Sequence, residues 1–289
     1  MAKEKFKLLK LLGGRPGGFA QTWQAEVLDP VLKARWGRVV AIEIPLTREI
    51  ERILINGLIL NSFLRTHLKQ VQDSHIVRYL DFERYENRYV MVMECVEGQS
   101  LRERIEDIGE GHPLALAEAI NIAKQTCQGM SELHRHGLIM GDLKPGIIII
   151  THPDNRVKID ILPIMLAFKS QPEYSSVSLS AMYYMSPEVL GNNNKSIYSD
   201  IYSLGVILYE MLTGAIPFQG EHPTEVLAAI LDGNVTPPGK LNPMVDNGLN
   251  QLVLKSMAAD WRHRYQTSTE LLEVLGTYQA KLGHIQGVC

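Results

Sequence analysis

The run from Ser199 to Thr213 constrains the fold of this chain more than any other segment. It is almost entirely apolar and is followed by Gly214, a pattern typical of a helix that ends in a left-handed glycine. A helix that is apolar on all faces must be surrounded by other elements, and the run is too short to cross a bilayer. We therefore expect this helix at the centre of a large, mostly helical unit.

The sequence before about Met93 predicts strands, together with one main helix over residues 48–69 in which Gly57 weakens the helical pattern. The segment around Trp36 is expected to be irregular. Residues 96–289 are expected to be mostly helical and residues 1–95 to form a separate unit, within one two-part domain. The strands are expected at residues 6–12, 22–27, 38–45, 76–82 and 88–93. The later helices are expected at residues 116–136, 199–213, 223–232, 246–258 and 267–281, and a hairpin at residues 147–150 and 156–161.

The composition excludes several classes of partner. The chain has 289 residues, a net charge of −3 and three cysteines. Without a basic excess, we expect neither nucleic-acid binding nor membrane insertion. Few and widely spaced cysteines indicate free thiols in a reducing compartment, and no signal peptide is visible after Met1. We therefore expect a cytoplasmic protein.

Four segments carry a resemblance to a known family. They read Asp142-Leu143-Lys144-Pro145, Met182-Tyr183-Tyr184-Met185-Ser186-Pro187-Glu188, Asp200-Ile201-Tyr202-Ser203-Leu204-Gly205 and Asp260-Trp261-Arg262-His263-Arg264. In order and spacing, the chain resembles bacterial-type Ser/Thr protein kinases from about Lys5 to about Gln279. The resemblance implies an α+β, bilobal protein-kinase-like fold, with a five-stranded antiparallel N-lobe, one main N-lobe helix and a mostly helical C-lobe. It also implies structural roles for Asp200 and for a buried ion pair between Glu188 and Arg264.

The chain departs from the family at the strand lysine that meets the phosphates of ATP. Where the family reads Val-Ala-Ile-Lys, this sequence reads Val40-Ala41-Ile42-Glu43. Strand alternation puts Ala41 and Glu43 on one face, which the resemblance turns toward the nucleotide cleft. A unit charge about 4 Å from a phosphate charge is worth roughly 4 kcal/mol at an effective dielectric near 20, so an ionised Glu43 would repel ATP. Two alternatives are a solvated Glu43 that leaves ATP binding untouched and a substitute cation, Arg15 or Arg38.

Other cleft positions are also substituted. The helix glutamate is expected near Leu64, and no acidic residue lies between Arg52 and Gln72. The arginine before the catalytic aspartate is replaced by Gly141. In the resemblance, the remaining cleft positions are Gly13, Gly17, Gly18, Ala20, Ala41, Met93 and Cys95.

The metal ligands of the family are replaced by apolar residues. Ile147 takes the place of the metal-binding asparagine, and Ile161 that of the metal-binding aspartate, unless a shift of one residue presents Asp160 instead. Isoleucine offers no oxygen to Mg²⁺. Asp142 and Lys144 are interpreted as vestiges of the catalytic loop with structural roles.

These departures predict a pseudokinase that is not an enzyme and does not bind ATP and Mg²⁺ in the usual way. Its expected role is to hold a protein partner, such as an active kinase or flanking domains of a larger chain. Two alternatives remain: a Ser/Thr kinase with residual, atypical phosphotransfer, and a nucleotide-binding switch that works without metal.

Overall fold

The computed structural model describes residues 5–13, 20–58, 71, 73–161 and 179–286. These residues form two compact units. The first contains the described residues up to Glu97, together with Asp160 and Ile161, and the second contains residues 98–159 and 179–286. The predictions for Leu64, Gly17, Gly18 and Arg15 lie outside the described residues.

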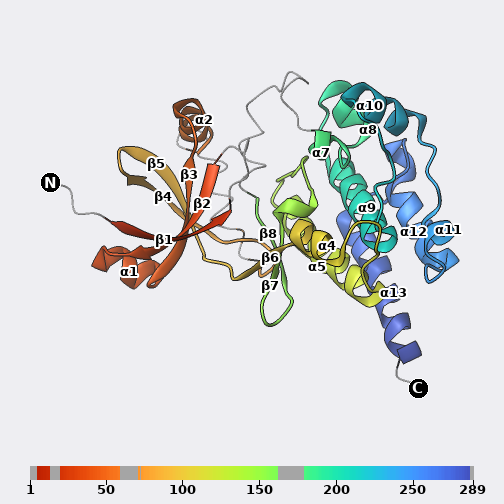
Figure 1. The fold of residues 1–289 in the computed structure, drawn as a ribbon, viewed down its shortest axis with the longest axis horizontal. Helices are drawn as coiled ribbons and strands as arrows, with labels where there is room; N and C mark the ends of the chain where they lie inside the picture. The colour runs from red at the N-terminus through yellow and green to blue at the C-terminus, as the bar shows by residue number, and fades with distance from the viewer. Residues whose placement is uncertain (1–4, 14–19, 59–70, 72, 162–178, 287–289) are drawn as a thin grey trace. The chain divides into compact units, whose positions relative to one another are not determined.

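The first unit is built on an antiparallel sheet of five strands in the order β1-β2-β3-β5-β4 (Figure 1). The predicted α+β kinase-like fold is confirmed. The bounds are β1 Phe6–Gly13, β2 Ala20–Val27, β3 Val39–Pro45, β4 Tyr79–Tyr85 and β5 Arg88–Met93, with helices α1 Pro30–Trp36 and α2 Arg48–Leu58.

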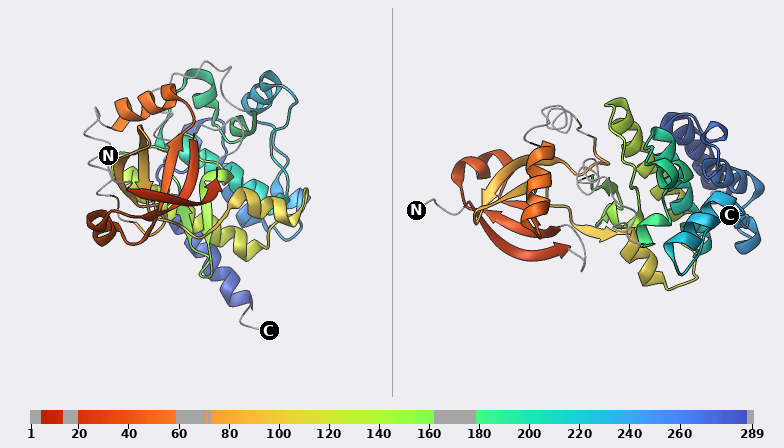
Figure 2. Two further views of the ribbon diagram at one scale, coloured as in Figure 1. Left: turned by 60° about the vertical axis from the view of Figure 1, so that its left-hand side comes forward. Right: turned by 90° about the horizontal axis from the view of Figure 1, so that it is seen from above.

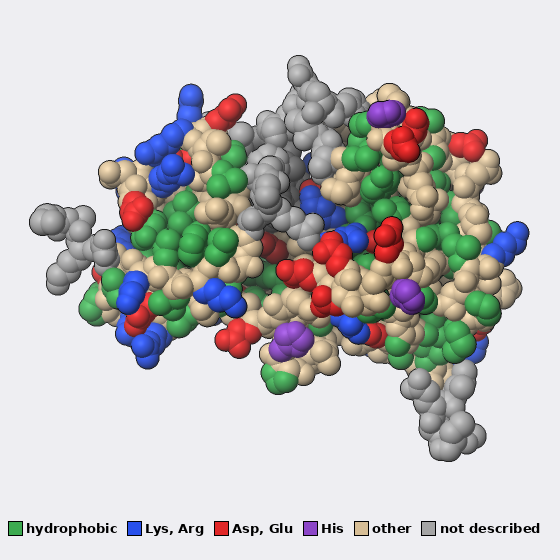
Figure 3. Space-filling model, viewed as in Figure 1, with side chains coloured by type: hydrophobic (Ala, Val, Ile, Leu, Met, Phe, Trp, Pro, Cys, Tyr) green, Lys and Arg blue, Asp and Glu red, His purple; other side chains and the backbone are tan. Residues whose placement is uncertain are grey.

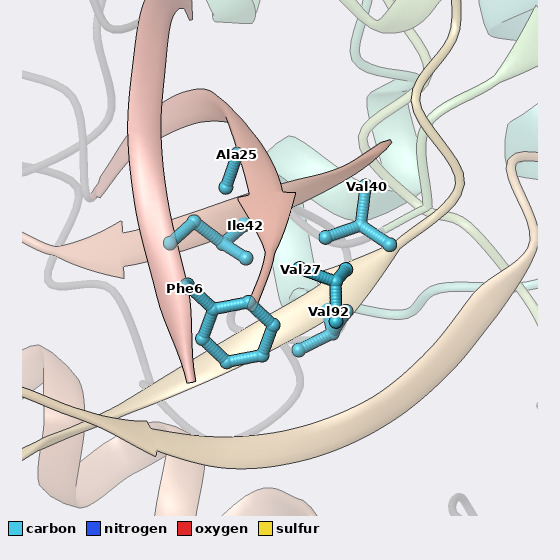
Figure 4. Close-up of a cluster of buried hydrophobic side chains, with 6 residues drawn as sticks. All are labelled: Phe6, Ala25, Val27, Val40, Ile42 and Val92. Carbon is cyan, nitrogen blue, oxygen red and sulfur yellow. The ribbon is translucent and has the colours of Figure 1, made fainter. Parts of the chain in front are cut away.

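Strand alternation separates the two faces of β3. Val40 and Ile42 are fully buried in a cluster with Phe6, Val27 and Val92, among others (Figure 4). Ala41 and Glu43 point to the other face, where the strand register pairs them with Met93 and Met91 of β5. The carboxyl group of Glu43 therefore lies on the face opposite to the hydrophobic cluster.

The irregular segment expected around Trp36 is instead the short helix α1. Asp29 caps it by accepting hydrogen bonds from the backbone N–H groups of Val31 and Leu32, and Pro30 occupies its first turn. Trp36 packs against the cluster and stacks on Phe6 with ring centroids 6.5 Å apart. The capping signal at Asp29-Pro30 was present in the sequence.

The edge strand β1 carries exposed apolar and basic side chains together. Leu9, Leu11 and Leu12 are exposed, and Figure 3 shows hydrophobic side chains gathered on the visible face of this unit. Lys7 and Lys10 lie on the same strand and are exposed. Charged side chains on an edge strand oppose pairing with another sheet.

The second unit surrounds the apolar helix α9, Ile197–Thr213. Every residue from Ser199 to Thr213 is buried, and Gly214 ends the helix with φ of 71°, as expected. Helix α5, Leu116–Arg135, packs against both α9 and α13, Ser268–Gln286 (Figures 1 and 2). The other helices are α4 Leu101–Ile108, α7 Leu179–Met182, α8 Pro187–Asn192, α10 Pro223–Asp232, α11 Pro238–Leu241 and α12 Asn247–Ser256, with 3₁₀ turns η1 Pro145–Ile147 and η3 Trp261–His263.

The predicted hairpin is present as part of a small sheet. Strands β7, Ile148–Thr151, and β8, Val157–Ile159, pair with each other, and β6, Gly98–Ser100, pairs with β7. None of the helices within the described ranges is both long and apolar enough to cross a bilayer.

Candidate active site

The loop that follows α5 carries the candidate catalytic residues, and Asp200 of α9 holds it in place. The Asp200 carboxylate is fully buried. It accepts hydrogen bonds from the backbone N–H groups of Met140, at 2.9 Å, and Gly141, at 2.6 Å. Hydrogen bonds to an ionised acceptor are stronger than those between neutral groups. The residue that precedes Asp142 is therefore tied directly to the central helix.

His134, near the end of α5, completes this anchor. Its Nε2 lies 2.8 Å from Oδ2 of Asp200, and its Nδ1 lies 3.1 Å from the hydroxyl of Ser268. The motifs quoted from the sequence do not include His134. The structure shows that it orients the aspartate that holds the loop.

Asp142 and Lys144 form an ion pair at the centre of the loop. Lys144 Nζ donates to Oδ2 of Asp142 at 2.7 Å, and the two side chains are 30% and 15% exposed respectively. The carboxylate therefore keeps a solvent-accessible fraction while a cation lies against it. A carboxylate can accept a proton from a hydroxyl, and an ammonium can neutralise a phosphate oxygen.

Gly141 has φ of +66°, a conformation that L side chains rarely adopt. A Cβ atom at this position would lie 2.5 Å from Cδ of Lys195. The space beside the glycine is thus occupied by a lysine from the connection between α8 and α9. Burial lowers the pKa of Lys195, while the charges of Asp142 and Asp200 act to raise it and Lys144 acts to lower it.

Ile147 is the last residue of the loop turn η1. It is 4% exposed, and its N–H donates to the carbonyl of Lys144 at 3.1 Å. The backbone keeps the turn, but the side chain is part of the hydrophobic core. Ile161 is also buried.

The described residues do not supply the usual ligand set for Mg²⁺. Ile147 offers no oxygen, and within the described ranges no group of three or more His, Cys, Asp or Glu side chains could hold a metal ion. Mg²⁺ prefers oxygen ligands in octahedral geometry. In this loop, Asp142 and Lys144 are the side chains that can act on a hydroxyl or a phosphate group.

Glu43 is 7% exposed, and its Oε2 has no hydrogen-bond partner among the described residues. Burial, followed by the negative charge of Asp160, raises the pKa of Glu43 well above its ordinary value. An ionised carboxylate without a partner is very costly inside a protein. Burial thus shifts the group toward its neutral form, and the alternative of a solvated Glu43 is wrong because the side chain is buried.

The remaining predicted cleft residues of the first unit lie on or beside its strands. Gly13 ends β1 and Ala20 begins β2. Ala41 and Met93 are paired across β3 and β5 and are both buried. The Cys95 thiol accepts a hydrogen bond from Gln24 at 3.6 Å, and burial raises its pKa.

Glu188 and Arg264 form a bidentate ion pair in the second unit. The two Nη atoms of Arg264 lie 2.7 and 2.9 Å from the carboxylate oxygens of Glu188. The arginine side chain has no exposed surface and also donates to the carbonyls of Tyr198, Ala258 and Ala259. Every donor atom of the guanidinium is therefore satisfied.

Comparison with known proteins gives consistent matches. The protein kinase domain family matches residues 65–275. Serine/threonine-protein kinase PrkC of Bacillus subtilis is 31% identical over 92% of this chain and 39% of its own length. Probable serine/threonine-protein kinase PknB of Lactococcus lactis is 30% identical over 95% of this chain and 42% of its own length. The chain thus spans about two fifths of the length of these relatives.

These matches overturn two predictions. The chain was expected not to be an enzyme and to use neither ATP nor Mg²⁺. Its relatives are named Ser/Thr protein kinases, and kinases of this class use ATP and Mg²⁺. Both predictions took the substituted positions as proof of inactivity. They gave too little weight to the loop that carries Asp142 and Lys144.

Proposed function

Because this chain belongs to the protein kinase domain family, we propose that it transfers phosphate from ATP to serine or threonine side chains of proteins with an atypical set of catalytic groups. The observation that carries the proposal is the Asp142–Lys144 pair, held in a loop that is anchored to the buried Asp200. These contacts fix the backbone next to Asp142, as the positioning of a catalytic carboxylate requires.

The roles follow from the chemistry of the two side chains. ATP supplies the γ-phosphoryl group: the substrate hydroxyl oxygen bonds to its phosphorus, and ADP leaves as the bond to the β-phosphate oxygen breaks. The Asp142 carboxylate accepts the proton of the substrate hydroxyl, and Lys144 carries the positive charge that phosphate oxygens need. Phosphoryl transfer depends mainly on positioning and charge neutralisation, so an anchored loop can support it even where other groups are replaced. The altered position Ile147 makes this catalysis atypical and predicts a low rate.

The experiment is a radiolabelled phosphate-transfer assay with ATP, Mg²⁺ or Mn²⁺, and generic protein substrates. Asp142→Asn keeps the size of the side chain and removes the base. We expect it to lower the rate on the order of 10²–10⁴-fold. Asp107→Asn, at an exposed position of α4, is the matched control and should leave the rate unchanged. Absence of transfer by the unmodified protein, or equal rates for it and Asp142→Asn, would refute the proposal.

A second role as a protein-interaction domain is favoured by Ile147. This apolar side chain packs into the core at the position where the resemblance implies a metal-binding asparagine. Such a role can coexist with weak catalysis. The fraction of the relatives that the chain spans, about two fifths, makes flanking domains a suitable class of partner. Co-purification of the domain with flanking segments tests the interaction role.

We place the domain in the cytoplasm, where ATP is available and where the free thiols Cys95 and Cys127 stay reduced.

A further inference from the structure

We propose that Lys195 is a positioning residue for Asp142, reaching the catalytic loop from the connection between α8 and α9 through the space that Gly141 leaves open. This inference rests on the proposed function, because it gives Asp142 a role that needs a fixed orientation. Nothing in the motifs of the sequence singled out Lys195.

The first support is steric. The aliphatic part of Lys195 lies against the Cα of Gly141, since a Cβ built there would be 2.5, 2.9 and 3.2 Å from Cδ, Cγ and Cε. Gly141 directly precedes Asp142 in the chain, and its N–H is held by Asp200. The lysine stem therefore packs on the residue that directly precedes Asp142, and this contact limits how that part of the loop can move.

The second support is the charge around the lysine. Lys195 precedes α9, whose N-terminal end carries a partial positive charge that disfavours a cation. The half-buried lysine also loses water, and burial lowers its pKa. The facing charged groups are Asp142 and Asp200, which act to raise the pKa, and Lys144, which acts to lower it. The two carboxylates thus offset part of the cost of placing the ammonium there, and burial remains the larger effect.

The arrangement differs from the family pattern that the sequence resembles. There the residue at position 141 is an arginine; here the position is glycine with φ of +66°. The cationic side chain beside the loop is instead Lys195, which comes from the connection between α8 and α9. Lys144 pairs directly with Asp142, while Lys195 packs on the neighbouring Gly141 and its charge interacts with that of Asp142.

The first test measures coupling without any assay of activity. NMR titration of labelled lysine side chains, with the Lys195 signal assigned from Lys195→Arg, should show a lowered pKa for Lys195. Asp142→Asn should lower the pKa of Lys195 further, because it removes a charge that favours the ammonium. Asp107→Asn should leave it unchanged. An unchanged Lys195 titration in Asp142→Asn would overturn the inference.

The second test separates positioning from folding. We expect Lys195→Met to lower kcat on the order of 10–100-fold with little change in the KM for ATP, as a misplaced catalytic group does. Lys195→Arg should restore most of the rate. Lys195→Gln repeats the test if Lys195→Met does not fold. In the Asp142→Asn background, Lys195→Met should cost nothing more, because both changes act through the same carboxylate. Independent, multiplicative losses would overturn the inference.

The two tests keep this inference apart from the proposed function. If the protein transfers no phosphate but the titrations of Lys195 and Asp142 are coupled, the proposed function fails and the positioning contact stands. If phosphate is transferred and depends on Asp142, but the titrations are uncoupled, only the inference about Lys195 fails.

Discussion

The buried carboxyl group of Glu43 makes a quantitative prediction about stability. Its Oε2 is buried without a hydrogen-bond partner among the described residues, and the register places the side chain opposite Met91 on the same face of the sheet. An unpaired buried acceptor costs about 1–3 kcal/mol even when neutral. We therefore expect Glu43→Met, which replaces the carboxyl by an apolar side chain of similar size, to raise the free energy of unfolding by about 1–3 kcal/mol.

The pH dependence follows from the raised pKa of Glu43, which is due first to burial and then to Asp160. A group whose pKa is higher in the folded state stabilises the fold below its unfolded pKa, about 4.3 for a glutamate. That stability is lost as the pH rises through the folded pKa. Compared with the neutral variant Glu43→Gln, the free energy of unfolding of the unmodified protein should fall by at most about 1.4 kcal/mol per pH unit. This fall is expected between the unfolded and the folded pKa of Glu43.

Urea unfolding from pH 4 to pH 8, followed by tryptophan fluorescence, measures both effects. Trp23 and Trp36 pack against the cluster of the first unit, so a Trp261→Phe background assigns the signal to that unit. Glu49→Gln, at an exposed position of α2, is the matched control. If the free energies of unfolding of Glu43→Gln and of the unmodified protein differ by a constant amount across this pH range, Glu43 is not a buried, neutral acid.

Two further changes test the second unit. Arg264→Met should lower the free energy of unfolding by about 3–5 kcal/mol in urea, because it leaves the Glu188 carboxylate, only 16% exposed, without its cation; a loss below about 1 kcal/mol would contradict the bidentate pair. Gly141→Ala should cost about 1–2 kcal/mol for its left-handed backbone alone, and more if Lys195 cannot move, as thermal melting would show. No loss of stability in Gly141→Ala would exclude the conformation described.

The sequence predicted the elements whose signals are local. The helix at 199–213 was expected from its apolar run and Gly214, and α9 matches it with two further residues at its start, Ile197 and Tyr198. The helix α1 was missed although Asp29-Pro30 is a capping signal, because its few residues give too little periodicity. Local pattern was sufficient where a helix is long, and insufficient where it is short.

The contacts of the candidate site were harder to predict, because they join segments far apart in the sequence. His134 and Lys195 carry no motif, and only the packing of α5 and α9 brings them to Asp200 and Gly141. The sequence showed that position 141 lacks an arginine. It could not show which side chain would fill the space, since that depends on the conformation of the connection before α9.

Glu43 shows why the argument for inactivity went too far. The alternation of β3 correctly placed Glu43 on the face of Ala41, but the expected repulsion of phosphate required an ionised carboxylate. Burial raises the pKa of Glu43 and so shifts the group toward its neutral form, which repels ATP less than the ionised form does. The neutral form can donate a hydrogen bond. A charge reversal that is inferred from sequence therefore matters only if the new group stays ionised, which requires contact with solvent. Here the fold buries Glu43 and removes most of that contact.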